Sequence, residues 1–523
     1  SGRRTAILFT VLSLLTAALF TADLLIGSVA VALRDIWAAL TGGSCDPAVR
    51  DIILKIRLLK AVTALFAGAA LAASGLQMQT LFRNPLAGPY VLGISSGAGL
   101  GVALFLLGAP LLGVSAHSFV QSLSIAGAAW LGAALVLLIV MAVSRRIKDI
   151  MVILILGMMF GSGISSVVEI LQYLSSEAAL KSFVIWTMGS LGDVTGGNLA
   201  LMLPVIAAGL VLSIAAIKPL NLLLLGENYA RTMGLNVQRT RTLLFLSTVL
   251  LAGTVTAFCG PVGFIGLAVP HLARMLFASA DHRILMPGSM LAGAALLLVC
   301  DLISKTLALP INTVTALMGI PVVIIVVVRN RNLFKMAADT LHTPRLHTGP
   351  APGTPGISLH GLTLAYGRRV LLRDADAVLP QGSITALIGR NGTGKSTLLR
   401  AIAGLGTATG EIRLCGKPLA ALTALQRAST VSFVTTDKIR IANLACEDVV
   451  ALGRAPYTNW IGRMQQADRD IVSRSLSLVG MSSFARKTMD RMSDGECQRI
   501  LIARALAQDT PVILLDEPTA FLD

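Results

Sequence analysis

The chain has 523 residues, of which 54% are hydrophobic and 13% are charged, and its mean hydropathy is +0.77. This composition excludes a wholly soluble enzyme and a disordered protein, and 6 cysteines are too few for a secreted disulfide scaffold. The net charge of +16 leaves nucleic-acid binding open until the basic residues are placed along the chain.

The first 340 residues have the composition of a membrane protein. A helix needs about 20 apolar residues to cross a bilayer. The sequence predicts ten such helices, and the first is too long, and too closely followed by others, to be a cleaved signal. They are residues 6–27, 58–80, 91–113, 119–143, 150–173, 198–217, 241–260, 264–280, 284–303 and 312–329.

Ten spans put both ends of this part on the same side of the membrane. If that side is the cytoplasm, the inner loops carry about twice as many Lys and Arg as the outer ones. This agrees with the rule that cytoplasmic loops of membrane proteins are enriched in Lys and Arg. We therefore predict a multi-pass protein in a lipid bilayer, with a cytoplasmic N-terminus and no nucleic-acid partner. The outer segment 34–60 breaks the rule, because it carries several basic residues.

A composition change follows the last predicted span. Four prolines and three glycines between His342 and Gly356 can neither hold a helix nor pair as a strand. Charged residues are about twice as frequent after this stretch as before it. The sequence thus predicts a transmembrane domain at 1–340, a Pro/Gly-rich linker at 341–356 and a soluble α/β domain at 357–523.

A glycine-rich loop carries the clearest chemistry of the soluble part. Residues 384–388 predict a buried strand and 397–403 a helix, and the intervening 389–396 read Gly-Arg-Asn-Gly-Thr-Gly-Lys-Ser. Backbone N–H groups of such a loop surround phosphate at a helix N-terminus. Lys395 is expected to reach the β- and γ-phosphates in catalysis, and Ser396 to hold Mg²⁺. The nucleotide-binding candidates are Gly389, Asn391, Gly392, Gly394, Lys395, Ser396 and Thr397.

A second apolar strand is predicted at 511–515 and ends in two carboxylates. Asp516 would reach Mg²⁺, and Glu517 would polarise a water against the γ-phosphate as a general base. Taken alone, this stretch could also be an ordinary acidic turn. The presence of the glycine-rich loop in the same chain disfavours that alternative.

The segment before this strand predicts a helix that begins after Ser493. Glu496 lies three residues further on, which is a capping-box spacing. The residues alone leave two interpretations open, a simple capped helix and a second helix N-terminus that faces phosphate.

These motifs together resemble those of an ABC-type ATPase, over about residues 357–523. The resemblance implies ATP and Mg²⁺ as cofactors and a partner subunit whose ATP is contacted by Ser493 and Gly495. It also implies that Tyr366 stacks on adenine.

Three positions depart from the pattern of that family. Asp494 stands where the signature has glycine, and it would bring a negative charge near phosphate. The family's glutamine falls at Thr436, whose side chain is shorter, although Asp437 lies next to it. In the family, a γ-phosphate-sensing histidine follows the strand that ends in the two carboxylates, so we expect the ATPase domain to be incomplete at Asp523 and the reading frame to continue.

Two stretches of the membrane part resemble the permease family that imports iron–siderophore chelates, haem and cobalamin. They are 57–101, which contains Arg-Asn-Pro-Leu-Ala-Gly, and 258–274, which contains Gly-Pro-Val-Gly-Phe-Ile-Gly-Leu. The resemblance covers about residues 50–335, and the family's ten helices agree with the predicted number. It implies the bacterial inner (plasma) membrane, a cytoplasmic ATPase domain, a periplasmic substrate-binding protein as partner, and a homodimer of the fused chains.

The resemblance also assigns a coupling helix to the inner loop 226–234, which would dock on the ATPase. Glu227, Arg231 and Gly234 are its expected contact residues. A charged amphipathic connector without that role is the alternative.

The basic outer residues gain an interpretation from the same family. Arg57, Lys60 and Lys305 correspond to residues that meet acids on the binding protein, where opposite charges would steer and orient docking. Cations that only extend to the membrane interface are the alternative.

The overall prediction is an α-helical membrane domain of about ten transmembrane helices, followed by an α/β P-loop ABC ATPase domain. We expect an ATP hydrolase coupled to import of an iron chelate (siderophore), haem or cobalamin. An ABC exporter and a non-transporting membrane-bound nucleotide sensor are the alternatives. The sequence does not identify the cargo.

Overall fold

The computed structural model describes residues 2–111, 118–147, 149–331, 355–366, 369–390, 392–437 and 439–518. The chain forms two compact units, and each is described separately. The helical unit comprises Ser1–Ile217 and Arg241–Asn332, and the mixed unit comprises Lys218–Thr240 and Leu333–Asp523. The linker predicted at 341–356 lies outside the described residues apart from its last two positions.

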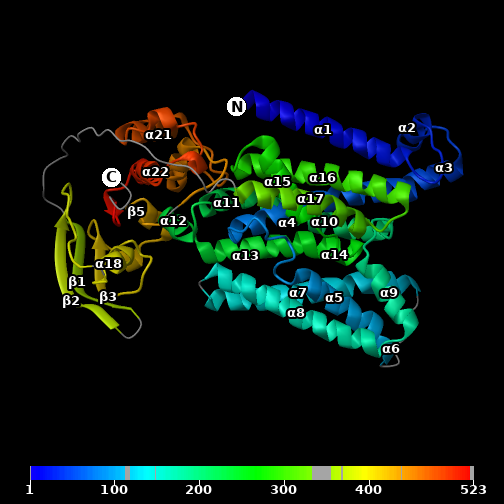
Figure 1. Cartoon of the computed structure of the whole chain (residues 1–523), viewed down its shortest axis with the longest axis horizontal. Helices are drawn as coiled ribbons and strands as arrows, with labels where there is room; N and C mark the ends of the chain where they lie inside the picture. Colours follow the sequence, from blue (N-terminus) through cyan, green and yellow to red (C-terminus); the bar gives the residue numbers. More distant parts are fainter. Residues whose placement is uncertain are drawn as a thin grey trace. The chain divides into compact units, whose positions relative to one another are not determined.

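The helical unit consists of long helices that lie side by side (Figure 1). Short π-helical turns at Ile52–Arg57, Leu104–Gly108 and Val249–Gly253 join consecutive helices without breaking them. Its helices are α1 Gly2–Leu25, α2 Leu33–Thr41, α3 Pro47–Asp51, α4 Leu58–Leu81, α5 Ile94–Ala103, α6 Ala109–Leu111, α7 Ser118–Arg146, α8 Ile150–Leu174, α9 Glu177–Thr187, α10 Gly196–Ala215, α13 Val237–Thr248 (which starts in the mixed unit), α14 Thr254–Cys259, α15 Ile265–Phe277, α16 His282–Leu307 and α17 Ile311–Arg331.

Every predicted membrane span coincides with an apolar helix. Among the described residues, 7 helices are long and apolar enough to cross a bilayer. The other three predicted spans correspond to the shorter apolar helices Ile94–Gly108, Ile265–Phe277 and Ile311–Ile325. The predicted α-helical membrane domain is therefore confirmed, with boundaries that shift by a few residues, as expected for helix ends.

Helix α4 is the buried centre of this unit and packs against α10, α15 and α16. Two of these crossings depend on glycine, because a Cβ at Gly75 would collide with the backbone oxygen of Gly266, and one at Gly68 with that of Gly293. The Gln77 amide of α4 donates to Ser247 at 3.2 Å and accepts from Thr248 at 3.3 Å. Close packing at small residues and buried hydrogen bonds thus hold the helices together, because the hydrophobic effect contributes little between helices in lipid.

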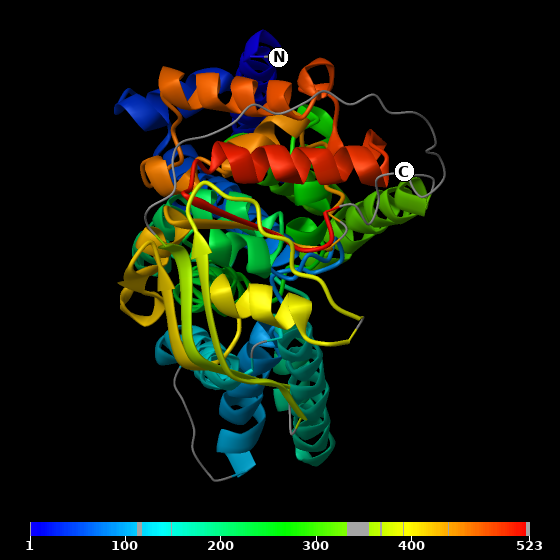
Figure 2. The ribbon, with the colours of Figure 1, turned by 90° about the vertical axis from the view of Figure 1, so that its left-hand side faces the viewer.

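The mixed unit contains two sheets. An antiparallel sheet has the order β2-β1-β3-β4, and β5 pairs with β6 in parallel. Ala401 and Ile402 of α18 join strand residues in the main core of this unit, and Figure 2 shows α18 beside the antiparallel strands. The elements are β1 Pro355–Tyr366, β2 Arg369–Pro380, α18 Lys395–Ile402, β3 Thr409–Leu414, β4 Lys417–Pro418, α19 Ala424–Ala428, β5 Val431–Val434, α20 Cys446–Leu452, α21 Gln466–Leu478, α22 Asp494–Ala507 and β6 Val512–Leu515, with α11 Ile217–Leu223 (whose first residue belongs to the helical unit) and α12 Glu227–Thr232 from the membrane-domain sequence.

One of the two strands predicted around the nucleotide motifs is correct and the other is wrong. Residues 511–515 contain β6, as predicted. Residues 383–390 form no strand, and Ile384 and Ile388 are 100% and 90% exposed. Among the described residues, β6 pairs with β5 alone. An apolar run of five residues does not specify a strand unless a neighbouring strand pairs with it.

Candidate functional site

Two glycines of the glycine-rich loop adopt a left-handed backbone. Gly392 and Gly394 adopt φ of 80° and 100°, a region that a residue with a Cβ rarely enters. Gly394 is the N-cap of α18, so the loop leads directly into a helix N-terminus and Thr397 lies in its first turn. Asn391 lies outside the described residues.

Two side chains of this loop have hydrogen-bond partners in the structure. Lys395 donates from Nζ to the carbonyl oxygens of Gly389 at 2.6 Å and Arg390 at 3.0 Å, so its amine lies over the loop. Ser396 donates from Oγ to Oδ1 of Asp516 at 2.9 Å, although the two residues are far apart in sequence. A hydroxyl and a carboxylate that converge in this way are the oxygen ligands that Mg²⁺ prefers.

The two carboxylates after β6 lie in different environments. Asp516 is 3% exposed and bound to Ser396, whereas Glu517 is exposed. Glu517 also adopts a left-handed backbone with φ of 46°, which is costly for a residue other than glycine and is typical of functional turns. The buried acid therefore suits a cation, and the exposed acid suits a proton acceptor that contacts water.

Ser493 is the N-cap of α22, as the sequence predicted. Its Oγ accepts from the N–H of Glu496 at 3.2 Å, and its own N–H donates to the Glu496 carboxylate at 2.7 Å. Gly495 lies in the first turn of this helix. Tyr366, the predicted adenine contact, ends β1, and its side chain is not described. The capping box does not distinguish between the two interpretations that the sequence left open.

Residues 435–437 include Thr436, the position at which the sequence comparison with the ATPase family placed its glutamine. Thr435 donates from its hydroxyl to Asp437 Oδ2 at 3.0 Å, and the N–H of Asp437 donates back to that hydroxyl at 3.3 Å. The carboxylate next to Thr436 is therefore engaged within its own turn.

Helix α12 packs into the mixed unit through Tyr229, which is 1% exposed. The Tyr229 hydroxyl accepts from the N–H of Thr435 at 3.0 Å and donates to its carbonyl oxygen at 3.4 Å. The Arg504 guanidinium of α22 lies 4.7 Å from the centre of the Tyr229 ring. Burial raises the pKa of Tyr229 and lowers that of Arg504 to about 10. Tyr229 thus connects α12 to Thr435 and to α22.

Two more side chains attach this segment to the mixed unit. Gln508 donates from Nε2 to the carbonyl oxygen of Thr232 at 2.8 Å and to that of Ala428 at 2.7 Å. Lys218 donates from Nζ to the carbonyl oxygens of Thr458 and Asn459 at 2.9 and 3.0 Å, and burial lowers its pKa.

The three coupling residues named from the sequence lie beside these contacts. Glu227 and Arg231 form a pair along α12 with an N–O distance of 3.9 Å. Gly234 has φ of 91°, and a Cβ there would lie 3.2 Å from the Ala428 methyl. Sequence reasoning missed Tyr229, Arg504 and Gln508, because their partners are distant in the chain. A lone aromatic residue within a polar six-residue helix was the one available signal.

The three docking candidates have partners within the helical unit. Arg57 is 5% exposed and donates to the carbonyl oxygens of Leu24 at 2.9 Å, Leu25 at 3.1 Å and Val29. Its guanidinium is therefore not a surface group in this conformation.

The two lysines belong to an ion cluster that connects α1, α4 and α16. Lys305 lies 2.6 Å from Asp23 and 3.4 Å from Asp301, and Lys60 lies 3.2 Å from Asp301. Both carboxylates are buried, while the side chain of Lys60 is 22% exposed. Docking through these lysines would have to compete with these internal acids.

Comparisons with known proteins agree with both parts of the chain. Residues 14–329 match the FecCD transport family, and residues 372–520 match the ABC transporter family. The hemin transport system permease protein HmuU of Yersinia pestis is 36% identical over 332 residues, which cover 62% of this chain and 95% of that relative. The vitamin B12 import system permease protein BtuC of Citrobacter koseri is 38% identical over 284 residues, which cover 53% and 83%.

A solved structure is also similar. It is an inward-facing conformation of a metal-chelate type ABC transporter, with a TM-score of 0.55 and 30% identity, and the match covers 62% of this chain and 99% of that one. The fold and the matched domains define a membrane permease joined to an ABC-type ATPase domain in one chain. The chain belongs to the FecCD transport family.

Proposed function

We propose that the chain uses ATP to import an iron chelate (siderophore), haem or cobalamin across the bacterial inner membrane. The observation that carries the proposal is the Ser396–Asp516 contact at 2.9 Å, in a chain whose other part is a FecCD permease. The relatives' names, which refer to hemin, vitamin B12 and metal chelates, support this cargo class. The exporter alternative is less well supported, because it does not account for a permease of this family.

In this proposal each residue of the nucleotide site has one task. Lys395 leaves the loop carbonyls to bind the β- and γ-phosphates, and Ser396 and Asp516 hold Mg²⁺, which neutralises charge on the phosphate oxygens when it is bound. Glu517 accepts a proton from the attacking water. Ser493 and Gly495 of a second chain close the site from the other side.

An exposed face of α8 supports the homodimer part of the proposal. The most apolar stretch of α8 is only 17% buried. Ser162, Ser166, Glu169 and Tyr173 are exposed and spaced 4, 3 and 4 residues apart, so they share one helix face. A carboxylate that faces lipid is costly. We therefore infer that this face lines an aqueous path between two chains.

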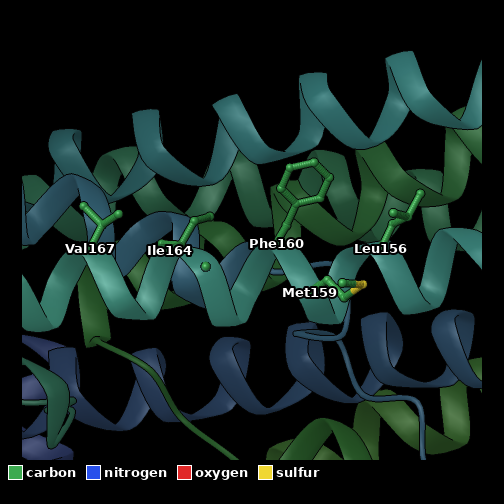
Figure 3. A pocket seen from close by; sticks show the side chains of 6 residues that line it. Leu156, Met159, Phe160, Ile164 and Val167 are labelled. Atoms are coloured by element: carbon green, nitrogen blue, oxygen red, sulfur yellow. The ribbon is translucent and has the colours of Figure 1, made fainter.

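The neighbouring side of α8 is apolar and hollowed. A groove of about 370 Å³ is lined by Leu156, Met159, Phe160, Ile164 and Val167, whose side chains lie along the helix in Figure 3. Apolar side chains of a second copy would fit such a groove, because close van der Waals packing stabilises helix contacts within lipid.

Replacing Lys395 with alanine should abolish both ATP hydrolysis and uptake. The test uses the chain in proteoliposomes, with labelled haem, cobalamin or ferric siderophore, with and without a binding protein. Uptake that requires ATP and a binding protein supports the proposal. Efflux would instead indicate an exporter, nucleotide binding without transport would indicate a sensor, and K395A that still transports would contradict the proposed engine.

We further propose that an acidic surface of a periplasmic binding protein docks at Lys60 and Lys305. Lys60→Glu should weaken that docking by about tenfold at low salt, because it places like charges opposite each other. Lys55→Glu is the matched control, since Lys55 lies in the same outer segment, is 71% exposed and pairs with Asp51. Equal affinities of K60E and K55E for the binding protein would contradict docking at Lys60.

A further inference from the structure

Asp494 carries a second acidic charge in the first turn of α22, and it has a cationic partner. Nη2 of Arg440 lies 2.6 Å from Oδ1 of Asp494. This hydrogen bond raises the pKa of Arg440. The other acid of that turn, Glu496, is engaged by the N–H of Ser493 in the capping box. Asp494 therefore shares its charge with a guanidinium from a segment more than fifty residues earlier in the chain.

The Arg440–Asp494 pair lies next to the residues that we propose to contact ATP. Asp494 lies between Ser493 and Gly495, the residues proposed to contact ATP. A helix N-terminus attracts anions through its free N–H groups and its dipole, and an unpaired carboxylate there would repel a triphosphate. The sequence predicted that Asp494 brings a negative charge near phosphate, and the structure places the opposite charge of Arg440 beside it.

The backbone next to Arg440 is anchored in the interior of the mixed unit. Its neighbour Ile439 is 2% exposed, so the segment is anchored in the interior. Asp437, Arg440, Asp494 and Leu501 line a cavity of about 10 Å³ between this segment and α22, which has room for about one water molecule. Thr435, at the start of the same segment, is bonded to Tyr229 of α12. Thr435 and Ile439 thus anchor the backbone that precedes Arg440.

We propose that Arg440 is a positioning residue for nucleotide capture, and that it neutralises Asp494 so that the α22 N-terminus accepts the triphosphate of ATP. This inference rests on the proposed function of Ser493 and Gly495. The pair is only partly buried, with side chains 39% and 34% exposed, so its contribution to folding stability is small. Its role is electrostatic and acts on the ligand.

The test is a double-mutant cycle on ATP hydrolysis by the chain in proteoliposomes. Arg440→Gln should raise KM for ATP by about tenfold with little change in kcat, because it removes a positive charge that lies 2.6 Å from the Asp494 carboxylate. In the Asp494→Gly background the same change should have less than about a twofold effect. Arg440→Lys should restore most of the affinity. The KM difference between R440Q and wild type should shrink at high salt, because exposed charges are screened.

Arg413→Gln is the matched control. Arg413 pairs with Glu411 at 3.0 Å, with side chains 44% and 42% exposed, on a strand of the antiparallel sheet. Its removal should leave KM unchanged. Equal KM values for R440Q and R413Q, or an R440Q effect that persists in D494G, would overturn the inference. Loss of hydrolysis in K395A alongside either result would show that the nucleotide site is correct and that only the role of Arg440 is wrong.

Discussion

Replacing Glu517 with glutamine should lower ATP hydrolysis by about a hundredfold to ten-thousandfold and leave ATP binding nearly intact. The amide has the shape of the acid but cannot accept the proton of the attacking water. Glu517 lies in a different environment from the proposed cation ligands Ser396 and Asp516. Asp516 is buried and accepts a hydrogen bond from Ser396, whereas Glu517 is exposed. Phosphate release and binding of a fluorescent ATP analogue measure the two effects separately.

Asp516→Asn provides the contrasting variant. It removes the charge that the Ser396 hydroxyl contacts at 2.9 Å, so the Mg²⁺ dependence of nucleotide binding should weaken as well as hydrolysis. If E517Q and D516N lost binding and hydrolysis in the same proportion, the two carboxylates would not have the separate tasks that we propose. If E517Q kept full hydrolysis, the general base would be another group.

The features that could be predicted from the sequence are those encoded by local pattern. Ten apolar segments predicted the helices, because the need to cross a bilayer fixes their length and composition. The Ser493–Glu496 capping box was also predictable, since its two bonds lie within four residues. The loop at 389–396 was identified because the spacing of its glycines before Lys395 and Ser396 is typical of a phosphate-binding loop.

Features that depend on distant partners were not predictable. The apolar run at 384–388 indicated a strand, yet pairing decides that outcome and the run has no β neighbour among the described residues. Lys60 and Lys305 were expected at a docking surface. The contact of Lys60 with Asp301 and that of Lys305 with Asp23 join different helices, so they became evident only in the structure. Arg440 attracted no attention in the sequence, because its partner Asp494 is remote.

Replacing Tyr229 with alanine should destabilise the mixed unit by about 3–5 kcal/mol and sharply reduce the substrate imported per ATP hydrolysed. The change removes a buried ring that faces Arg504 at 4.7 Å and leaves that fully buried guanidinium without its aromatic partner. It also removes the hydroxyl that bonds both backbone groups of Thr435. Thermal unfolding and uptake coupled to phosphate release measure the two consequences.

Two further variants distinguish the contributions of the Tyr229 ring, the Tyr229 hydroxyl and the charged side of α12 to stability and coupling. Tyr229→Phe keeps the ring and leaves the buried Thr435 N–H without its acceptor, so it should cost about 1–3 kcal/mol and weaken coupling only in part. Arg231→Ala removes one member of a partly exposed pair with an N–O distance of 3.9 Å, so its effect on stability should be about 0.5 kcal/mol or less. If R231A uncoupled transport as strongly as Y229A, the charged side would carry the coupling. An ordering of Y229A, Y229F and R231A from largest to smallest loss identifies Tyr229 as the anchor, because Tyr229 contacts both Arg504 of α22 and the backbone of Thr435.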